Sequence, residues 1–161
     1  MRKIGILVVV LALALLLVPA GASAGASVVR ADLSGANEVP PSGSPAVGSA
    51  VVKVQGDSLF FRVTGRLLSG PAFGAHIHAA PAGVNGSIIV GLCGLPVAAA
   101  KPSCAKPDGK FYVQGLITPA LAAANGTTVP ALWAAIQTGD TYVNIHTDAF
   151  PGGELRGQLI P

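Results

Sequence analysis

Apolar and polar side chains alternate along much of the chain, and this alternation predicts short β-strands. In residues 58–66, Phe61 and Val63 fall on one face of an extended chain, because successive side chains of a strand point to opposite sides. Residues 46–55 alternate in the same way, and Gly56-Asp57 between the two runs predicts a hairpin turn. The further strands that we expect are residues 28–33, 74–79, 87–92, 111–117, 141–147 and 154–160.

Residues 118–139 break the strand pattern and predict two short helices. Thr118-Pro119 resembles an N-cap followed by proline at the first helical position, which predicts a helical turn over residues 120–124. A second short helix is expected over residues 130–137, where Gly139 stops it. Antiparallel strands with one or two short helices predict a single all-β domain, built as a sandwich or barrel.

The first 24 residues have the pattern of a secretory signal peptide. Two basic residues precede an apolar run over residues 4–18, and Ala22-Ser23-Ala24 is a small-x-small cleavage site. The run is short for a membrane span, and Pro19 follows it instead of a charged flank, although an uncleaved anchor is the alternative. We therefore expect a secreted or periplasmic β domain of residues 25–161, with no membrane contact after cleavage.

The charge of the expected mature domain is nearly balanced. The whole chain has ten Lys and Arg against seven Asp and Glu, and two of the basic residues lie in the signal segment. The remaining eight basic and seven acidic residues form no basic cluster with aromatic residues, so nucleic acid is not an expected partner.

Cys93 and Cys104 form an even pair in a chain that we expect to be exported. A disulfide is the default interpretation in an oxidising compartment, and it would pin a loop with little strand character. The alternative is that the two thiolates bind a metal.

The three histidines of the chain fall in two of the expected strands. His76 and His78 lie two residues apart and therefore share a strand face, as do Tyr142, Asn144 and His146. Each of these faces is polar, with apolar side chains on the opposite face. If the two strands lie side by side, the three imidazoles form one composite site.

Four segments resemble a known family: residues 33–41, 74–78, 142–147 and 151–159. They are similar to the CHRD domain, a family that is named after chordin and has many exported bacterial members. The resemblance implies an all-β, immunoglobulin-like barrel or sandwich, distantly similar to copper/zinc superoxide dismutase. It implies little about activity.

The similarity to the dismutase concerns the histidines. His76-Ile77-His78 resembles the strand of that enzyme that carries two copper ligands, and His146 falls roughly where a late strand supplies another. The chain has no fourth histidine to match the further copper ligand, and the zinc ligands are missing as well. The resemblance therefore implies a copper site more than it implies dismutase activity.

Three histidines suit a copper or zinc ion and leave one coordination position open. Asp148, Glu154 or a water molecule are the candidates for a further ligand, and the affinity order of divalent metals favours copper over zinc. A shared metal at about 2.0–2.1 Å from each nitrogen requires ring nitrogens roughly 3–4 Å apart. The alternative is that the histidines are ordinary hydrogen-bonded residues with no metal.

Pro151-Gly152-Gly153 is expected to be a turn, followed by Glu154 and Arg156 on one face of the last strand. These two residues are expected to form an ion pair, which contributes little to stability at the surface and more if it is partly covered. The alternative role of Arg156 is to attract anions near the histidines.

Three other residues have expected places in the fold. Glu38 either joins the proline-rich segment 38–45 to the barrel or is solvated. Phe73 and Trp133 are expected in the core rather than in contact with a ligand.

Two functions agree with this pattern. The first is a secreted, non-catalytic binding domain for an extracellular ligand or protein that the sequence does not identify, which binds copper or zinc through the three histidines. The second is a copper-binding redox or dismutase-like protein. The sequence shows no nucleophile-elbow pattern and no phosphate-binding glycine loop, and it does not define an oligomeric state.

Overall fold

The computed structural model describes residues 27–94, 104 and 109–161, so the predicted signal peptide lies outside the described residues. The described residues form eight strands, one 3-10 helix and two short α-helices. The strands are β1 (Val28–Ser34), β2 (Val47–Gln55), β3 (Ser58–Arg66), β4 (Ala72–Ala79), β5 (Ser87–Gly94), β6 (Phe111–Ile117), β7 (Thr141–Thr147) and β8 (Phe150–Gln158). The helices are η1 (Gly35–Asn37), α1 (Pro119–Ala124) and α2 (Val129–Gln137).

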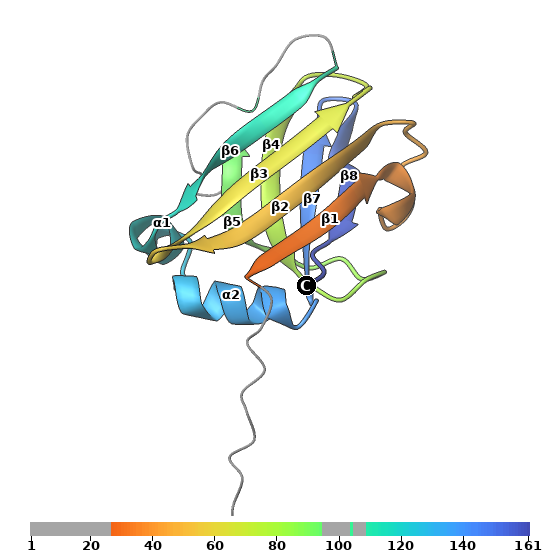
Figure 1. Ribbon diagram of the computed structural model, residues 1–161. Helices are drawn as coiled ribbons and strands as arrows, with labels where there is room; N and C mark the ends of the chain where they lie inside the picture. Colours follow the sequence, from red (N-terminus) through yellow and green to blue (C-terminus); the bar gives the residue numbers. More distant parts are fainter. Residues whose placement is uncertain (1–26, 95–103, 105–108) are drawn as a thin grey trace, which may run out of the picture.

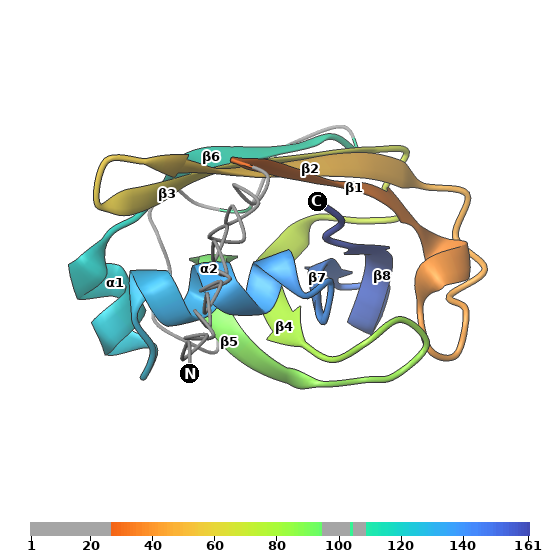
Figure 2. The ribbon, with the colours of Figure 1, turned by 60° about the horizontal axis from the view of Figure 1, so that its bottom comes forward.

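All eight strands belong to one antiparallel sheet in the order β5-β4-β7-β8-β1-β2-β3-β6. The sheet turns sharply between β8 and β1, which share only the pair Ser34 and Arg156. Two layers result, with β5, β4, β7 and β8 facing β1, β2, β3 and β6 (Figure 2). The expected all-β fold is confirmed as a nearly closed barrel.

The strand parity expected from the sequence decides which side chains form the core. Phe61 and Val63 of β3 are fully buried, and so are Ile77 of β4, Val143 of β7 and Leu155 of β8. The β2–β3 hairpin has the expected two-residue turn, since Gln55 pairs with Ser58. The buried residues form one cluster between the two layers.

Both predicted helices form, and each begins at a capping threonine. Thr118 Oγ1 accepts a hydrogen bond from Leu121 N at 3.2 Å, and Thr128 caps α2 in the same way. Figure 1 shows α2 across one end of the barrel, where Leu132 and Ile136 are buried and Trp133 packs against the core. Neither of these helices has the length and apolar sequence that crossing a bilayer requires.

The last strand differs from its predicted bounds. Pro151-Gly152-Gly153 lies inside β8 rather than in a turn, because Thr147 already pairs with Phe150 across a two-residue connection. Gly153 has a φ of +134°, a conformation open to glycine, so this glycine bends the strand without ending it. At the other end β8 stops at Gln158, and Ile160 makes only an isolated bridge to Arg30.

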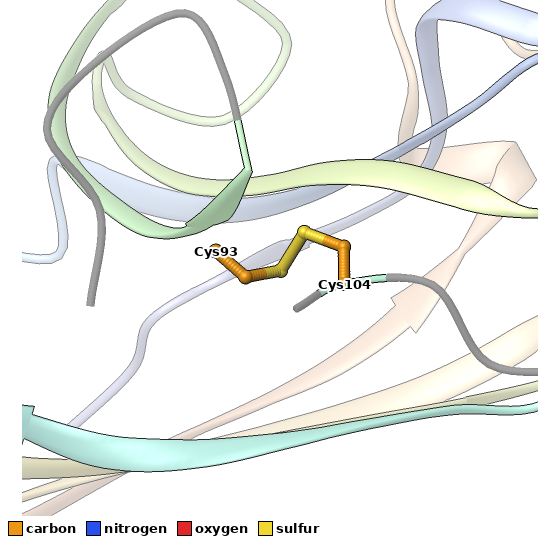
Figure 3. The surroundings of a disulfide bond; sticks show 2 residues. All are labelled: Cys93 and Cys104. Carbon is orange, nitrogen blue, oxygen red and sulfur yellow. A yellow bond between two sulfur atoms is a disulfide. The ribbon is translucent and has the colours of Figure 1, made fainter. Parts of the chain in front are cut away.

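The predicted disulfide is confirmed. Cys93 near the end of β5 is bonded to Cys104, with the two Cα atoms 5.3 Å apart (Figure 3). Both cysteines are buried in the core cluster. Most of the loop that the bond closes lies outside the described residues.

Removing the disulfide should destabilise the fold without changing it. We expect the C93A/C104A double variant to lose about 2–3 kcal/mol of unfolding free energy, because the open loop regains conformational entropy in the unfolded chain. Urea unfolding followed by circular dichroism measures the loss. An unchanged midpoint in the double variant and in reduced wild-type protein would contradict a stabilising role.

Candidate metal centre

The three histidines meet on the outer face of β4 and β7. Ala75 and Ile77 point into the core, so His76 and His78 project from the opposite side of β4. β7 runs antiparallel beside β4 with Gly74 opposite His146, which places His146 diagonally across from His76. One ligand nitrogen from each ring lies within 4.8 Å of the other two.

The three rings are close, but they are slightly wider apart than a bound metal requires. The ring centroids of His76 and His146 are 4.9 Å apart, and both lie 5.8–6.0 Å from the centroid of His78. A metal at about 2.0–2.1 Å would bring the nitrogens to roughly 3–4 Å. Small rotations of the imidazoles are therefore needed to close the site around an ion.

Irregular pairing on the other side of β4 helps to set the direction of the two histidines. The register between β4 and β5 shifts between Ala75 and His76, and again between Ile77 and His78. Such bulges occur often beside functional sites, because an extra residue in one strand re-aims the neighbouring side chains.

A loop of residues 80–86, which we call the covering loop, contacts the centre at His78, whose Nδ1 lies 3.0 Å from the carbonyl oxygen of Gly86. It passes along the side of the β4-β7-β8 layer that faces away from the other layer (Figure 2). His76 is 1% exposed, His78 7% and His146 8%. Outward-facing imidazoles of a sheet are thus shielded from water almost as completely as the core.

The hydrogen bonds of two rings fix their tautomers. Nδ1 of His78 lies 3.0 Å from the carbonyl oxygen of Gly86, and Nδ1 of His146 lies 3.0 Å from that of Pro151. A carbonyl oxygen only accepts, so Nδ1 carries the proton in each ring and Nε2 keeps a lone pair. Both Nε2 atoms are buried and have no hydrogen-bond partner.

This arrangement fits a metal ion. Metal-binding histidines commonly donate their second ring N–H to a backbone carbonyl, which orients the ring toward the ion. His78 and His146 have this bond, and their Nε2 atoms offer lone pairs that no described group uses.

Burial keeps the imidazoles neutral. It is the main reason that the pKa of His78 is lowered from 6.5 to about 4. The hydrogen bond to Gly86 acts in the opposite direction and raises this pKa, whereas the charges of His146 and Arg156 lower it. Burial also lowers the pKa of His146, although the hydrogen bond to Pro151 acts to raise it. At neutral pH these two rings therefore need to lose no proton before they bind a metal.

Tyr142 and Arg156 stack beside the centre. The Tyr142 ring lies parallel to His78 within 11°, at a centroid distance of 4.7 Å. The guanidinium carbon of Arg156 lies 3.5 Å from the centre of the Tyr142 ring, a cation–π contact. Because β7 lies between β4 and β8, the tyrosine separates the guanidinium from the imidazole.

Arg156 also holds the covering loop in place. Its guanidinium donates hydrogen bonds to Asn85 Oδ1 and to the carbonyl oxygens of Pro81 and Val84. Gln158 donates to the carbonyl oxygen of Ala80. The loop that covers the histidines is therefore bound to β8 through side chains that project from the same sheet face.

Glu38 joins the proline-rich segment to the barrel, which is one of its two expected roles. Its Oε1 accepts a hydrogen bond of 2.6 Å from Asn144 Nδ2. A Cβ atom on Gly153 would lie 2.7 Å from that Oε1, so this contact requires a glycine there. Burial raises the pKa of Glu38 to about 7, although Asn144 and the charge of Arg156 oppose the shift.

The expected ion pair between Glu154 and Arg156 is wrong. Glu154 is fully buried, and its oxygens accept hydrogen bonds from the hydroxyls of Ser44, Ser69 and Thr147 and from the backbone of Ser69. Burial alone would raise the pKa of Glu154, but these donors outweigh it and lower the pKa. The bend at β8 turns this carboxylate toward its own set of donors.

The structure does not bring either candidate accessory ligand into the histidine cluster. Glu154 is occupied by its hydroxyl donors, and Asp148 is exposed in the turn before β8. Among the described residues, the cluster of possible metal ligands consists of the three histidines alone.

The expectation that Phe73 belongs to the core is also wrong. Phe73 is 40% exposed, and its ring centroid lies 6.0 Å from that of His146. The register between β4 and β7 shifts between Ala72 and Gly74, and Ala72 takes the inward position instead. The phenyl ring therefore borders the metal centre from outside.

Comparison with protein families identifies the chain. The family model of the CHRD domain matches residues 29–159, so the chain belongs to the CHRD domain family and the resemblance noted in the sequence is confirmed. The comparisons with curated proteins and with solved structures found no match.

The buried site should show its protonation state in solution. We expect His78 and His146 of the metal-free protein to be Nδ1–H tautomers at pH 7, and His78 to remain neutral until the pH approaches 4. Long-range ¹H–¹⁵N NMR of the imidazoles measures both properties. An Nε2–H tautomer or an imidazolium form of His78 at pH 6 would contradict this geometry.

The same shift makes stability depend on pH. Because the folded-state pKa of His78 is lowered, its contribution to stability is complete above pH 6.5 and is lost as the pH falls toward 4. The expected loss is on the order of 3 kcal/mol. Glu38 acts in the opposite sense, since its raised pKa gives stability below pH 4.5 that is lost as the pH rises through 7. Urea unfolding of E38Q and E38Q/H78Q across this pH range measures the contribution of His78 to stability, because neither variant has the Glu38 carboxyl.

Proposed function

We propose that this CHRD domain is an exported, non-catalytic binding domain that binds one metal ion through His76, His78 and His146. Copper is the preferred metal and zinc the alternative. The observation that carries the proposal is the pair of buried Nε2 lone pairs on His78 and His146, each oriented by a backbone carbonyl.

A purely structural role explains these two nitrogens less well than a ligand does. A buried polar atom without a partner costs about 1–3 kcal/mol, and nearly all such atoms in folded proteins are hydrogen-bonded. A metal ion would satisfy both nitrogens at once and would use neutral imidazoles, which is the form in which the site is held.

The donor set favours copper over zinc. Imidazole suits both metals, and the affinity order of divalent ions places copper above zinc. Three histidines with water in the fourth position also form a normal zinc site, so the number of ligands leaves zinc as the alternative.

Export is supported by the chain's chemistry. The buried disulfide between Cys93 and Cys104 is typical of an oxidising compartment, and the first 24 residues have the pattern of a signal peptide. A secreted or periplasmic location gives the site access to copper outside the cytoplasm, and the partner there would be an extracellular ligand or protein.

Metal content is the direct test. Protein purified from the export compartment and incubated with Cu²⁺ or Zn²⁺ should hold about one metal ion per chain, because the three imidazoles form one site. Elemental analysis measures the ratio. The H76A, H78A and H146A variants should each lose most of the metal.

A neighbouring carboxylate supplies the control. D148N removes the exposed carboxyl of the turn before β8 and should keep the metal content of the wild type, since that group lies outside the cluster. Wild-type protein without bound metal, and with no change in melting temperature when Cu⁺, Cu²⁺ or Zn²⁺ is added, would rule out the proposal.

Redox or dismutase-like activity is the second candidate, and the open coordination position favours it. Superoxide chemistry requires that a small anion reach the metal, whereas each histidine is less than a tenth exposed. The chain also has no fourth histidine.

We expect little or no dismutase activity from the copper-loaded protein. A superoxide assay at equal copper concentration, with free copper removed by a chelator, measures it. Activity that survives the chelator and disappears in H146A would favour the enzyme over the binding domain.

A further inference from the structure

We propose that the histidine centre selects the cuprous ion, Cu⁺, over divalent ions, and that Arg156 sets this selectivity as a buried positive charge one aromatic ring away. The inference rests on the metal binding proposed above and concerns the charge of the ion that the same site accepts.

The donor atoms of the site carry no charge. The described ligands are three imidazoles, and neither a thiolate nor a carboxylate is among them. The complex therefore keeps the whole charge of its ion, which is one unit for Cu⁺ and two for Cu²⁺ or Zn²⁺. Because the desolvation cost of a buried ion grows with the square of its charge, a buried neutral site penalises divalent ions most.

Arg156 adds to this penalty. Its side chain is 1% exposed, and its guanidinium lies 3.5 Å from the Tyr142 ring that stacks on His78. Its described hydrogen-bond acceptors are two carbonyl oxygens and the amide of Asn85, which are all neutral. The repulsion that a fixed charge exerts on an ion is twice as large for a divalent ion as for a monovalent one.

Two carboxylates lie near this face. Glu154 is directed to its own hydroxyl donors. Glu38 is bonded to Asn144, and its raised pKa of about 7 leaves it only partly ionised at neutral pH. Arg156 is the charged side chain that reaches the His78 ring through a single aromatic ring.

The number of ligands leads to the same ion. Cu⁺ has a filled d shell and is stable with two or three donors, whereas Cu²⁺ prefers square-planar or tetragonal sites and Zn²⁺ prefers tetrahedral ones. A three-histidine cluster under a closed loop supplies what Cu⁺ needs without a further group.

The affinities of wild-type protein for the three ions test the selectivity. Cu⁺ affinity is measured without oxygen by competition with bathocuproine disulfonate, with ascorbate as reductant. Cu²⁺ and Zn²⁺ affinities are measured by competition with chelators of known strength. We expect Cu⁺ to bind at least about tenfold more tightly than either divalent ion.

Variants of Arg156 test its role. R156Q removes the charge and should raise Zn²⁺ affinity relative to Cu⁺ affinity by about tenfold. It should also lower the Cu²⁺/Cu⁺ reduction potential of the bound ion by about 59 mV, which is a tenfold change in equilibrium constant for a one-electron couple. R156K keeps the charge and should retain most of the selectivity. R62Q makes the same charge change on an arginine of β3 in the opposite layer and should leave the ratio of Cu⁺ to Zn²⁺ affinity unchanged.

The outcomes separate this inference from the proposed function. Failure to bind any of the three ions overturns both. Binding of Zn²⁺ or Cu²⁺ as tightly as Cu⁺ keeps the metal site and overturns the selectivity. If R156Q and R156K reduce the ratio of Cu⁺ to Zn²⁺ affinity equally, the selectivity depends on the packing of Arg156 and not on its charge, and the role given to Arg156 is wrong. The wild-type affinities decide the selectivity even if an Arg156 variant does not fold.

Discussion

The hydrogen bonds from Arg156 to the covering loop are the interaction on which the rest of the site depends. The loop contacts the His78 ring through the carbonyl oxygen of Gly86. The three imidazoles point away from the core, and yet they are almost fully buried. Burial in turn keeps His78 neutral, and its Nε2 has no hydrogen-bond partner among the described residues, which are the two properties that a metal ligand needs.

Arg156 can take this role because its own burial is well compensated. A guanidinium offers five N–H donors in a plane, so it can bind several carbonyl oxygens while its face stacks on an aromatic ring. Here the ring is Tyr142, whose hydroxyl in turn accepts a hydrogen bond from the backbone of Gly86 at the end of the covering loop. One side chain from β8 and one from β7 thus hold the loop, Arg156 at Pro81, Val84 and Asn85 and Tyr142 at Gly86.

Strand parity predicted the fold and much of the site, because alternation is a local property of the sequence. It placed His76 and His78 on one face and Tyr142, Asn144 and His146 on one face, as the structure has them. Other features depend on contacts between distant residues and left no local signal. The covering loop consists mostly of small residues, with two glycines and one proline, and only its bonds to Arg156, more than 70 residues later in the chain, show where it lies. The segment Pro151-Gly152-Gly153 was predicted as a turn for a related reason. The positive φ of Gly153 lies inside β8, where the lack of a side chain leaves room for the contact between the distant residues Glu38 and Asn144.

The same geometry bears on whether the histidines are merely structural. If burial were all that this face required, apolar side chains at positions 78 and 146 would provide it without the cost of two dry Nε2 atoms. The carbonyls of Gly86 and Pro151 would then have no imidazole N–H to accept, and the stacking of His78 on Tyr142 would have no particular purpose. The unpartnered Nε2 atoms raise the cost of an empty site, and the hydrogen bonds to the carbonyls orient both rings for a ligand. The proposed metal ion therefore explains the rings better than packing alone does.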